Sequence, residues 1–269
     1  MAILHVEYFS DALHMKRKVN VLYPEVGKVE NFTGTDIPVL YLLHGMTDTE
    51  NEWLSRTALD RMLHHTNVAL VMPEGDLSFY TNTTYGMNYY DAIAKELPEK
   101  MHFFFPNLST KPEKNFIAGV SMGGYGAMHV GLGVENFGYV GSLSGLLNIH
   151  GLEDHWAADK AYWDGVWGPM EKFPGSDNEI ITQAKNRTEN KPKIFSWIGK
   201  QDNIGLYPGT KEIIPQIEAL GYDVTFHEED GIHSWYSWLP AIQELLLWLP
   251  IGYVPESNAN DAKYTFAMS

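Results

Sequence analysis

Apolar and polar residues alternate over two segments near the start of the chain, LHVEYFS (residues 4–10) and KRKVNVLYP (16–24). Alternation with a period of two residues is typical of a strand that buries one face. A short polar link joins the two segments. The pattern therefore predicts an antiparallel β-hairpin.

Beyond the hairpin the pattern changes to six compact apolar runs, at 38–45, 68–75, 115–121, 139–145, 193–202 and 224–231. Continuous apolarity over about four to eight residues is typical of strands that are buried on both faces of a parallel sheet. Segments suited to helices lie between most of these runs, at 57–66, 87–101, 124–136, 209–221 and 234–249. This order predicts an α/β fold, with a mostly parallel sheet and helices on both faces.

The exception to the alternation is a long, tryptophan-rich segment at 146–192. It is too long for a simple connection between strands, so we expect an insertion that forms a lid or cap over the active-site end of the sheet. With 269 residues, the chain is predicted to be one elaborated domain, 1–269.

Composition narrows the range of partners. The chain has 19 lysines and arginines against 34 aspartates and glutamates, a net charge of −15, so we expect neither a nucleic-acid surface nor an anionic membrane surface. It has no cysteine, which excludes a disulfide framework and a thiol nucleophile. No export signal is recognised, and the longest apolar stretch, 245–254, is shorter than a membrane span. These features predict a cytoplasmic protein that acts on a small molecule.

The stretch FIAGVSMGGYGAMHV, residues 116–130, contains the pattern G-x-S-x-G around Ser121, between a predicted strand and a predicted helix. This is the pattern of a nucleophile elbow, a sharp turn that exposes the serine hydroxyl and leaves room only for small neighbours. Ser121 is therefore the predicted nucleophile.

A serine nucleophile needs a base and an acid that orients the base, and in this architecture they follow in the order serine, acid, histidine. Asp202 ends the apolar strand of IGKQDNIG, and His233 lies in EEDGIHSWYSW, between the last strand and the last helix. We predict these two as the acid and the base.

Other candidates fit less well. The acids Glu228, Glu229 and Asp230 suit a solvated loop, and His227 falls within strand alternation. A metal site formed by His150, Asp154 and His155 is a minor alternative.

Two backbone N–H groups are predicted to form the oxyanion hole, those of Met46, after the strand that breaks at His44 and Gly45, and of Met122, after the nucleophile. Aromatic side chains are candidates for the substrate pocket, namely Trp53, Tyr85 and Trp235, with Trp156 and Trp163 from the insertion.

With these residues assembled, the chain resembles the esterase D-like branch of the α/β-hydrolases, and within it bacterial tributyrin (acetyl) esterases. The resemblance rests on MAILHVEYFSDALHMKRKVNVLYP, YLLHGMTDTENEWLSRT, MPEGDLSFYTNTTYGMNYYDAIAKELP, FIAGVSMGGYGAM, IGKQDN and GIHSWYSW, and covers nearly the whole chain. It implies a carboxylesterase for short acyl chains, with Ser121, Asp202 and His233 as the triad and Met46 and Met122 as oxyanion donors. No metal or cofactor is implied. Members of the family often form homo-oligomers.

Three alternatives remain open. One is an S-formylglutathione hydrolase-like thioesterase, whose early loop typically reads SGLTC where this chain has HGMTD and no cysteine. Another is an acyltransferase that uses the same triad with a sugar or alcohol as acceptor. The third is a non-catalytic α/β-hydrolase module that binds a ligand or a partner.

Overall fold

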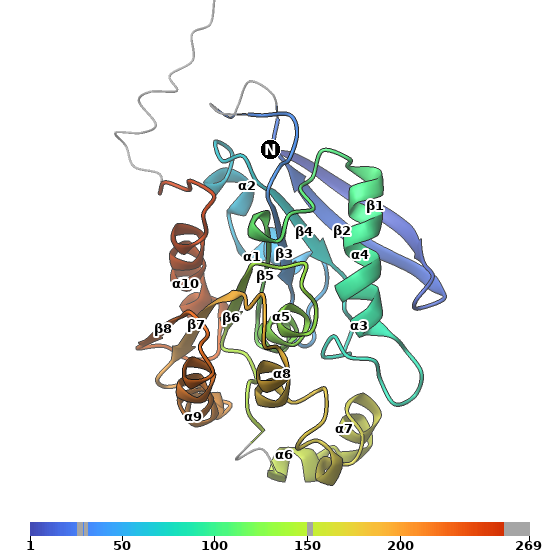
Figure 1. The fold of residues 1–269 in the computed structure, drawn as a ribbon, viewed down its shortest axis with the longest axis vertical. Coiled ribbons are helices and arrows are strands. Elements are labelled where there is room, and N and C mark those ends of the chain that lie inside the picture. Colours follow the sequence, from blue (N-terminus) through green and yellow to red (C-terminus); the bar gives the residue numbers. More distant parts are fainter. Residues whose placement is uncertain (26–28, 30–31, 150–152, 256–269) are drawn as a thin grey trace, which may run out of the picture.

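The computed structural model describes residues 1–25, 29, 32–149 and 153–255. Its centre is an eight-stranded sheet in the order β1-β2-β4-β3-β5-β6-β7-β8 (Figure 1). The strands from β4 to β8 in this order are parallel, whereas β2 pairs antiparallel with both β1 and β4. The bounds are β1 (Ala2–Ser10), β2 (Met15–Tyr23), β3 (Val39–Leu43), β4 (Ala69–Pro73), β5 (Asn115–Val120), β6 (Tyr139–Leu143), β7 (Lys193–Gly199) and β8 (Val224–Glu229).

The predicted positions of the strands are confirmed. The burial of the last run differs from the prediction, because β8 lies at the edge of the sheet and its residues are half-buried or exposed. Every residue of β3, β4 and β5 is buried, as continuous apolar runs predict for strands covered on both faces. Over its first half β1 alternates between half-buried and exposed residues, and it forms the predicted hairpin with β2.

Helices cover both faces of the sheet. Val39, Tyr41 and Leu43 of β3 enter one hydrophobic cluster, whereas Leu40 and Leu42 enter another. The first cluster includes residues of α5 (Met122–Gly133), α8 (Ile180–Asn186) and α9 (Leu206–Ala219), and the second includes residues of α1 (Glu52–Arg56), α2 (Leu59–Met62) and α10 (Trp235–Trp248). The helices outside the 146–192 segment are α1 (Glu52–Arg56), α2 (Leu59–Met62), α3 (Tyr89–Asp91), the π-helix η1 (Ala92–Glu96), α4 (Leu97–Phe104), the 3₁₀ helix η2 (Pro112–Lys114), α5 (Met122–Gly133), α9 (Leu206–Ala219) and α10 (Trp235–Trp248).

The helix predicted at 57–66 is shorter than expected. The structure has α2 over only four residues there, followed by a turn in which Thr66 N–H donates to the carbonyl of Leu63. Across 87–101, α3, η1 and α4 follow one another without a break. A π-helical stretch leaves the hydrophobic pattern of a helix readable but changes its hydrogen-bond spacing.

The 146–192 segment contains α6 (Glu153–Ala158), α7 (Lys160–Val166), the 3₁₀ helix η3 (Met170–Lys172) and α8 (Ile180–Asn186). Its aromatic side chains pack on one another, with ring centroids 5.5 Å apart for Trp156 and Trp167 and 5.1 Å apart for Trp167 and Phe173. The Tyr125 hydroxyl of α5 donates to the carbonyl of Asn178, 2.7 Å away, and so ties this segment to the helix after Ser121. Within the described residues, no helix is long and apolar enough to cross a membrane.

Candidate active site

Ser121 stands at the junction of β5 and α5, with φ 55° and ψ −119°. A non-glycine residue with this positive φ is strained, and such strain is common where a side chain has to be presented for chemistry. The backbone on both sides holds the turn, because Ser121 N–H donates to the Leu143 carbonyl of β6 and the Ser121 carbonyl accepts from Tyr125 N–H.

The glycines around Ser121 allow backbones to approach closely. A Cβ added at Gly119 would lie 2.3 Å from the Gly123 carbonyl oxygen, and one added at Gly123 would lie 2.2 Å from the Leu43 carbonyl oxygen. Neither clash could be relieved by moving a side chain, since both involve main-chain atoms. The start of α5 therefore packs directly on the end of β3.

Asp202 and His233 lie beside Ser121 although they are far apart in the sequence. His233 Nε2 is 2.8 Å from Ser121 Oγ, and His233 Nδ1 is 2.8 Å from Asp202 Oδ2. Asp202 follows β7, and His233 lies in the loop between β8 and α10. Parallel strands bring their carboxyl ends to one edge of the sheet, which explains why the three residues meet.

The hydrogen bonds around Asp202 and His233 determine which nitrogen of the His233 ring carries the proton. The other oxygen of Asp202, Oδ1, accepts from the N–H groups of Ile204 and Leu206, at 3.1 and 3.3 Å, as α9 begins. The Asp202 side chain is fully buried. An ionised carboxylate in this position favours a proton on His233 Nδ1, which leaves Nε2 to accept from the Ser121 hydroxyl.

The predicted oxyanion donors lie beside this hydrogen-bonded chain. Met46 and Met122 both line the cavity at Ser121. Neither N–H has a hydrogen-bond partner in the described part of the chain, and the N–H of Met122 lies in the first turn of α5, where no intrahelical acceptor exists. Both groups are thus free to bind a developing negative charge.

His44 orients the peptide that contains the first of these donors. Its Nδ1–H donates to the Gly45 carbonyl oxygen, 2.8 Å away, while its Nε2 accepts from Gly75 N–H. In a trans peptide the C=O and the following N–H point in opposite directions. The N–H of Met46 therefore points away from the fully buried His44 ring.

Two carboxyl groups lie behind His44. Burial raises the pKa of Glu50, and a hydrogen bond shared with Glu74 raises it further. Burial also opposes ionisation of Glu74, but its contacts with His44 Nε2, 3.5 Å away, and with Glu50 outweigh it and lower the pKa of Glu74 to about 2. Glu74 therefore loses its proton at a lower pH than Glu50 does. Closer to the site, burial and then the nearby Glu52 raise the pKa of Asp48.

The cavity at Ser121 has a volume of about 220 Å³, and its walls come largely from aromatic and aliphatic side chains. Trp156, Trp163 and Trp167 come from the 146–192 segment, and Phe79 comes from the loop after β4. Among the described residues, no carboxylate, lysine or arginine lines it. An uncharged, apolar group fits this lining.

Three of the residues predicted for the substrate pocket lie away from this cavity. Trp53 is fully buried in the core and packs edge-on against Trp235, with ring centroids 5.2 Å apart. Tyr85 is 63% exposed. None of the three lines the cavity at Ser121, whereas Trp156 and Trp163 do.

The minor metal alternative falls partly outside the part of the chain that the structure describes. His150 lies outside the described residues. Asp154 is exposed on α6, and His155 lines the Ser121 cavity.

Sequence reasoning missed Phe79 and the role of His44. Phe79 lies in a strained loop, with φ 48°, that follows β4. Its position after the carboxyl end of a parallel strand was the available signal, because loops at that edge carry the site in open α/β sheets.

The model of the family described as "Putative esterase" matches residues 10–249. The chain belongs to this esterase family. It is 29% identical over 264 residues to an acetyl esterase of Caldicellulosiruptor saccharolyticus, covering 93% of this chain and 98% of that protein. The predicted resemblance to acetyl esterases is thereby confirmed, and the esterase is a hydrolytic enzyme.

Solved structures agree with the fold of the esterase. Fluorophosphonate-binding serine hydrolase F of Staphylococcus aureus superposes with a TM-score of 0.81 at 29% identity, covering 92% of this chain and 98% of that one. An S-formylglutathione hydrolase of the same organism gives a TM-score of 0.80 at 29% identity with the same coverage. The predicted α/β-hydrolase fold is confirmed.

Proposed function

We propose that this esterase hydrolyses esters of short, uncharged acyl groups, with Ser121 as nucleophile, His233 as general base and Asp202 as the residue that orients His233. The observation that carries the proposal is the hydrogen-bonded chain from Ser121 through His233 to Asp202, which ends at an apolar cavity. The similarity to an acetyl esterase supports the substrate class.

The proposed reaction has two halves. His233 Nε2 takes the Ser121 proton as Oγ attacks the ester carbonyl, and Asp202 stabilises the imidazolium that forms. The N–H groups of Met46 and Met122 stabilise the oxyanion, and one such donor contributes about 2.7–4 kcal/mol in comparable sites. His233 then protonates the leaving alcohol, and water, activated in the same way, releases the acid from the acyl-enzyme.

Cavity size supports a short acyl chain. The volume of about 220 Å³ is well above the share of one water-sized group, about 30 Å³, so it holds more than an acetyl methyl group. It is also smaller than the roughly 300–1,000 Å³ of pockets for drug-sized ligands. We expect activity on acetyl to butyryl esters and a decline with longer chains. The 146–192 segment, which supplies three tryptophans of the wall, is proposed to act as a cap that sets this limit.

The test is hydrolysis of p-nitrophenyl esters of increasing acyl length, with Ser121→Ala as control. Loss of the nucleophile should lower kcat by about 10⁵-fold or more while the fold is kept. Near-normal turnover by this variant would refute the assignment of Ser121.

A thioesterase activity is the second candidate, favoured by the similarity to the staphylococcal S-formylglutathione hydrolase. The two are separated by comparing kcat/KM for p-nitrophenyl acetate with kcat/KM for S-formylglutathione. A value for the thioester at least 100-fold above that for the ester would favour the thioesterase.

A further inference from the structure

A row of polar side chains lies between the edge strand β8 and the final helix α10. Thr225 and His227 both project toward α10, where Trp248 Nε1–H donates to Thr225 Oγ1 and His227 Nδ1 lies 2.6 Å from Glu244 Oε2. Thr225 and His227 are two residues apart on the strand, which is a rise of about 6.6 Å. Glu244 and Trp248 are four residues apart on the helix, which is a rise of about 6 Å. The strand and the helix therefore advance by nearly the same distance between the two contacts.

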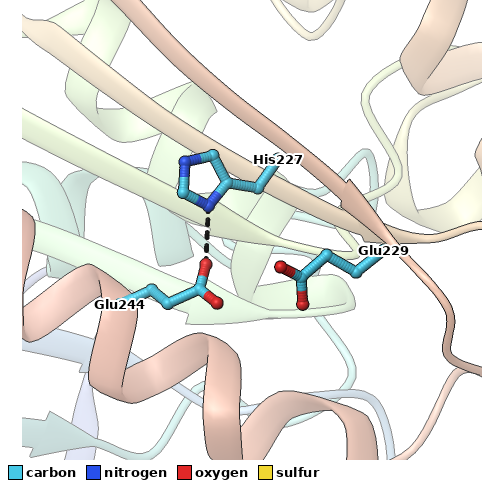
Figure 2. Close-up of side chains that lie close together, drawn as sticks. All are labelled: His227, Glu229 and Glu244. Carbon is cyan, nitrogen blue, oxygen red and sulfur yellow. Dashed lines mark hydrogen bonds and ion pairs between the residues drawn. The ribbon is translucent and has the colours of Figure 1, made fainter.

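Glu229 is the next residue on the same face of β8, and the register would place it beside Pro240, which has no polar side chain. Instead, its carboxylate turns toward His227 and Glu244 (Figure 2). One potential ligand atom from each of the three residues lies within 4.8 Å of the others. Among the described residues, the only hydrogen bond of this carboxylate is a long one, 3.5 Å, donated by Trp197 Nε1.

The charges of this group are not balanced. On the opposite face of β8, Glu228 pairs with Lys211 at 2.6 Å. Within the described residues, no lysine or arginine forms an ion pair with Glu229 or Glu244, in a chain with a net charge of −15. Two carboxylates close together on such a chain repel each other unless a cation or a proton lies between them.

We propose that His227, Glu229 and Glu244 bind a divalent cation of the Zn²⁺ type, which clamps β8 to α10. One imidazole nitrogen and two carboxylates form a ligand set that zinc accepts, with water in the fourth position. Calcium and magnesium prefer oxygen ligands alone, so the imidazole disfavours them.

Binding requires small local changes. A tetrahedral cation about 2.0–2.1 Å from each ligand holds the ligand atoms about 3.4 Å apart, so Nδ1 and the Glu244 oxygen separate slightly while Glu229 closes in. The side chains of His227 and Glu244 are 39% and 30% exposed and can make this adjustment. The cation takes the place of a proton on Nδ1, and the neutral ring keeps its proton on Nε2, so acid weakens binding.

The proposed metal site lies between the two elements that flank the loop of His233. β8 and α10 flank the loop that carries His233, and His233 N–H is itself held by Asn203 Oδ1 at 2.9 Å. A cation that joins the two elements would stabilise the frame of this loop without touching the reacting groups.

The experiment is a zinc titration of the chelator-treated full chain, followed by calorimetry and thermal unfolding. The expected result is one tight site per chain, with Tm raised by about 5 °C or more when zinc is 100-fold above Kd. The tight site should be lost in His227→Ala and weakened at least tenfold in Glu244→Gln and in Glu229→Gln, with each variant shown to be folded by circular dichroism.

A matched control variant removes two histidines that lie outside the proposed metal site. The ring centroids of His64 and His65 lie 3.6 Å apart, so this pair is the obvious competing place for zinc. The double variant His64→Ala/His65→Ala should keep the tight site. Tight binding that survives His227→Ala, or the absence of a tight site from the unmodified chain, would overturn the proposal. Equal stabilisation by Ca²⁺ that persists in His227→Ala would also overturn it.

Discussion

The two regions that meet at the cavity are built in different ways. On one side, the turn at Ser121 depends on main-chain atoms, with a strained serine and the backbone of Gly123 directly against Leu43. On the other side, the wall from the 146–192 segment depends on large side chains, among them Trp156, Trp163 and Trp167, which pack on one another at centroid distances of 5.0–5.8 Å.

The two regions suit two different tasks, which are positioning the reacting groups and accommodating the acyl group. Positioning a nucleophile and two N–H donors requires accuracy within a fraction of an ångström, which a crowded backbone provides. Accommodating an acyl group requires only a shape, which side chains can change without moving the backbone. We therefore expect substitutions in the first region to affect kcat and substitutions in the second to affect the choice of substrate.

Among substitutions outside Ser121, Asp202 and His233, the largest effect is expected from Gly123→Ala. The added methyl would lie 2.2 Å from the Leu43 carbonyl oxygen, so the start of α5 must shift and carry Met122 N–H with it. Turnover of p-nitrophenyl acetate should fall by at least about 10³-fold, because a displacement of about 1 Å already costs about 10²-fold and a proposed oxyanion donor is lost as well.

The control for this variant is Gly165→Ala in α7, where the nearest atom to an added Cβ, on Tyr85, is 3.5 Å away. It should keep full activity and gain stability of up to about 1 kcal/mol, since alanine is the better helix former. Equal activity in the two variants would show that the contact with Leu43 does not position the site.

A smaller loss is expected from His44→Ala, which removes the shorter of two hydrogen bonds to the Gly45 carbonyl, the other coming from Asp48 N–H at 3.3 Å. With the Gly45–Met46 peptide held less firmly, kcat should fall by about 10²-fold with little change in KM. Steady-state kinetics on the acetyl ester measure this split. A change in KM alone would mean that His44 supports binding and not the oxyanion hole.

Substitution of the wall should change preference more than rate. Trp163→Ala enlarges the cavity, so kcat/KM for hexanoyl relative to acetyl esters should rise by about tenfold. Tyr85→Ala, which alters an exposed aromatic residue outside the cavity, should leave the ratio unchanged. The same shift in both variants would argue against the 146–192 segment as the source of selectivity.

The smallest effect on turnover concerns His129 of α5, whose Nδ1–H donates to Gln183 of α8 and so joins the two regions. Burial lowers the pKa of His129 from its usual 6.5 to about 4, despite the opposing hydrogen bond with Gln183. Between these values the unfolded chain binds the extra proton, so stability falls as the pH falls from 6.5 to 4. The loss is on the order of 3 kcal/mol.

Urea unfolding at pH 7 and pH 4.5 measures this dependence. His129→Gln removes the titrating group and should make the free energy of unfolding less sensitive to pH in this window, with activity at pH 7 nearly unchanged. An unchanged slope would assign the acid sensitivity to other groups.

Much of the architecture was predictable from local patterns. Continuous apolar runs identified the buried strands, and alternation identified the hairpin, because burial on two faces or on one leaves a direct trace in residue order. The turn at Ser121 was readable for a similar reason, since its glycines and its strand-to-helix context lie within one short stretch.

Residue order alone therefore determined the fold class, the candidate nucleophile and the order of its partners along the chain. The folded arrangement decided which aromatic residues reach the cavity: Trp53 and Trp156 look alike in the sequence, yet one fills the core and the other lines the site. It also decided that His227, Glu229 and Glu244 converge. The reason is physical, because contacts between distant segments depend on the packing of whole elements, and a periodic pattern shows which face of an element is buried but not what it meets there.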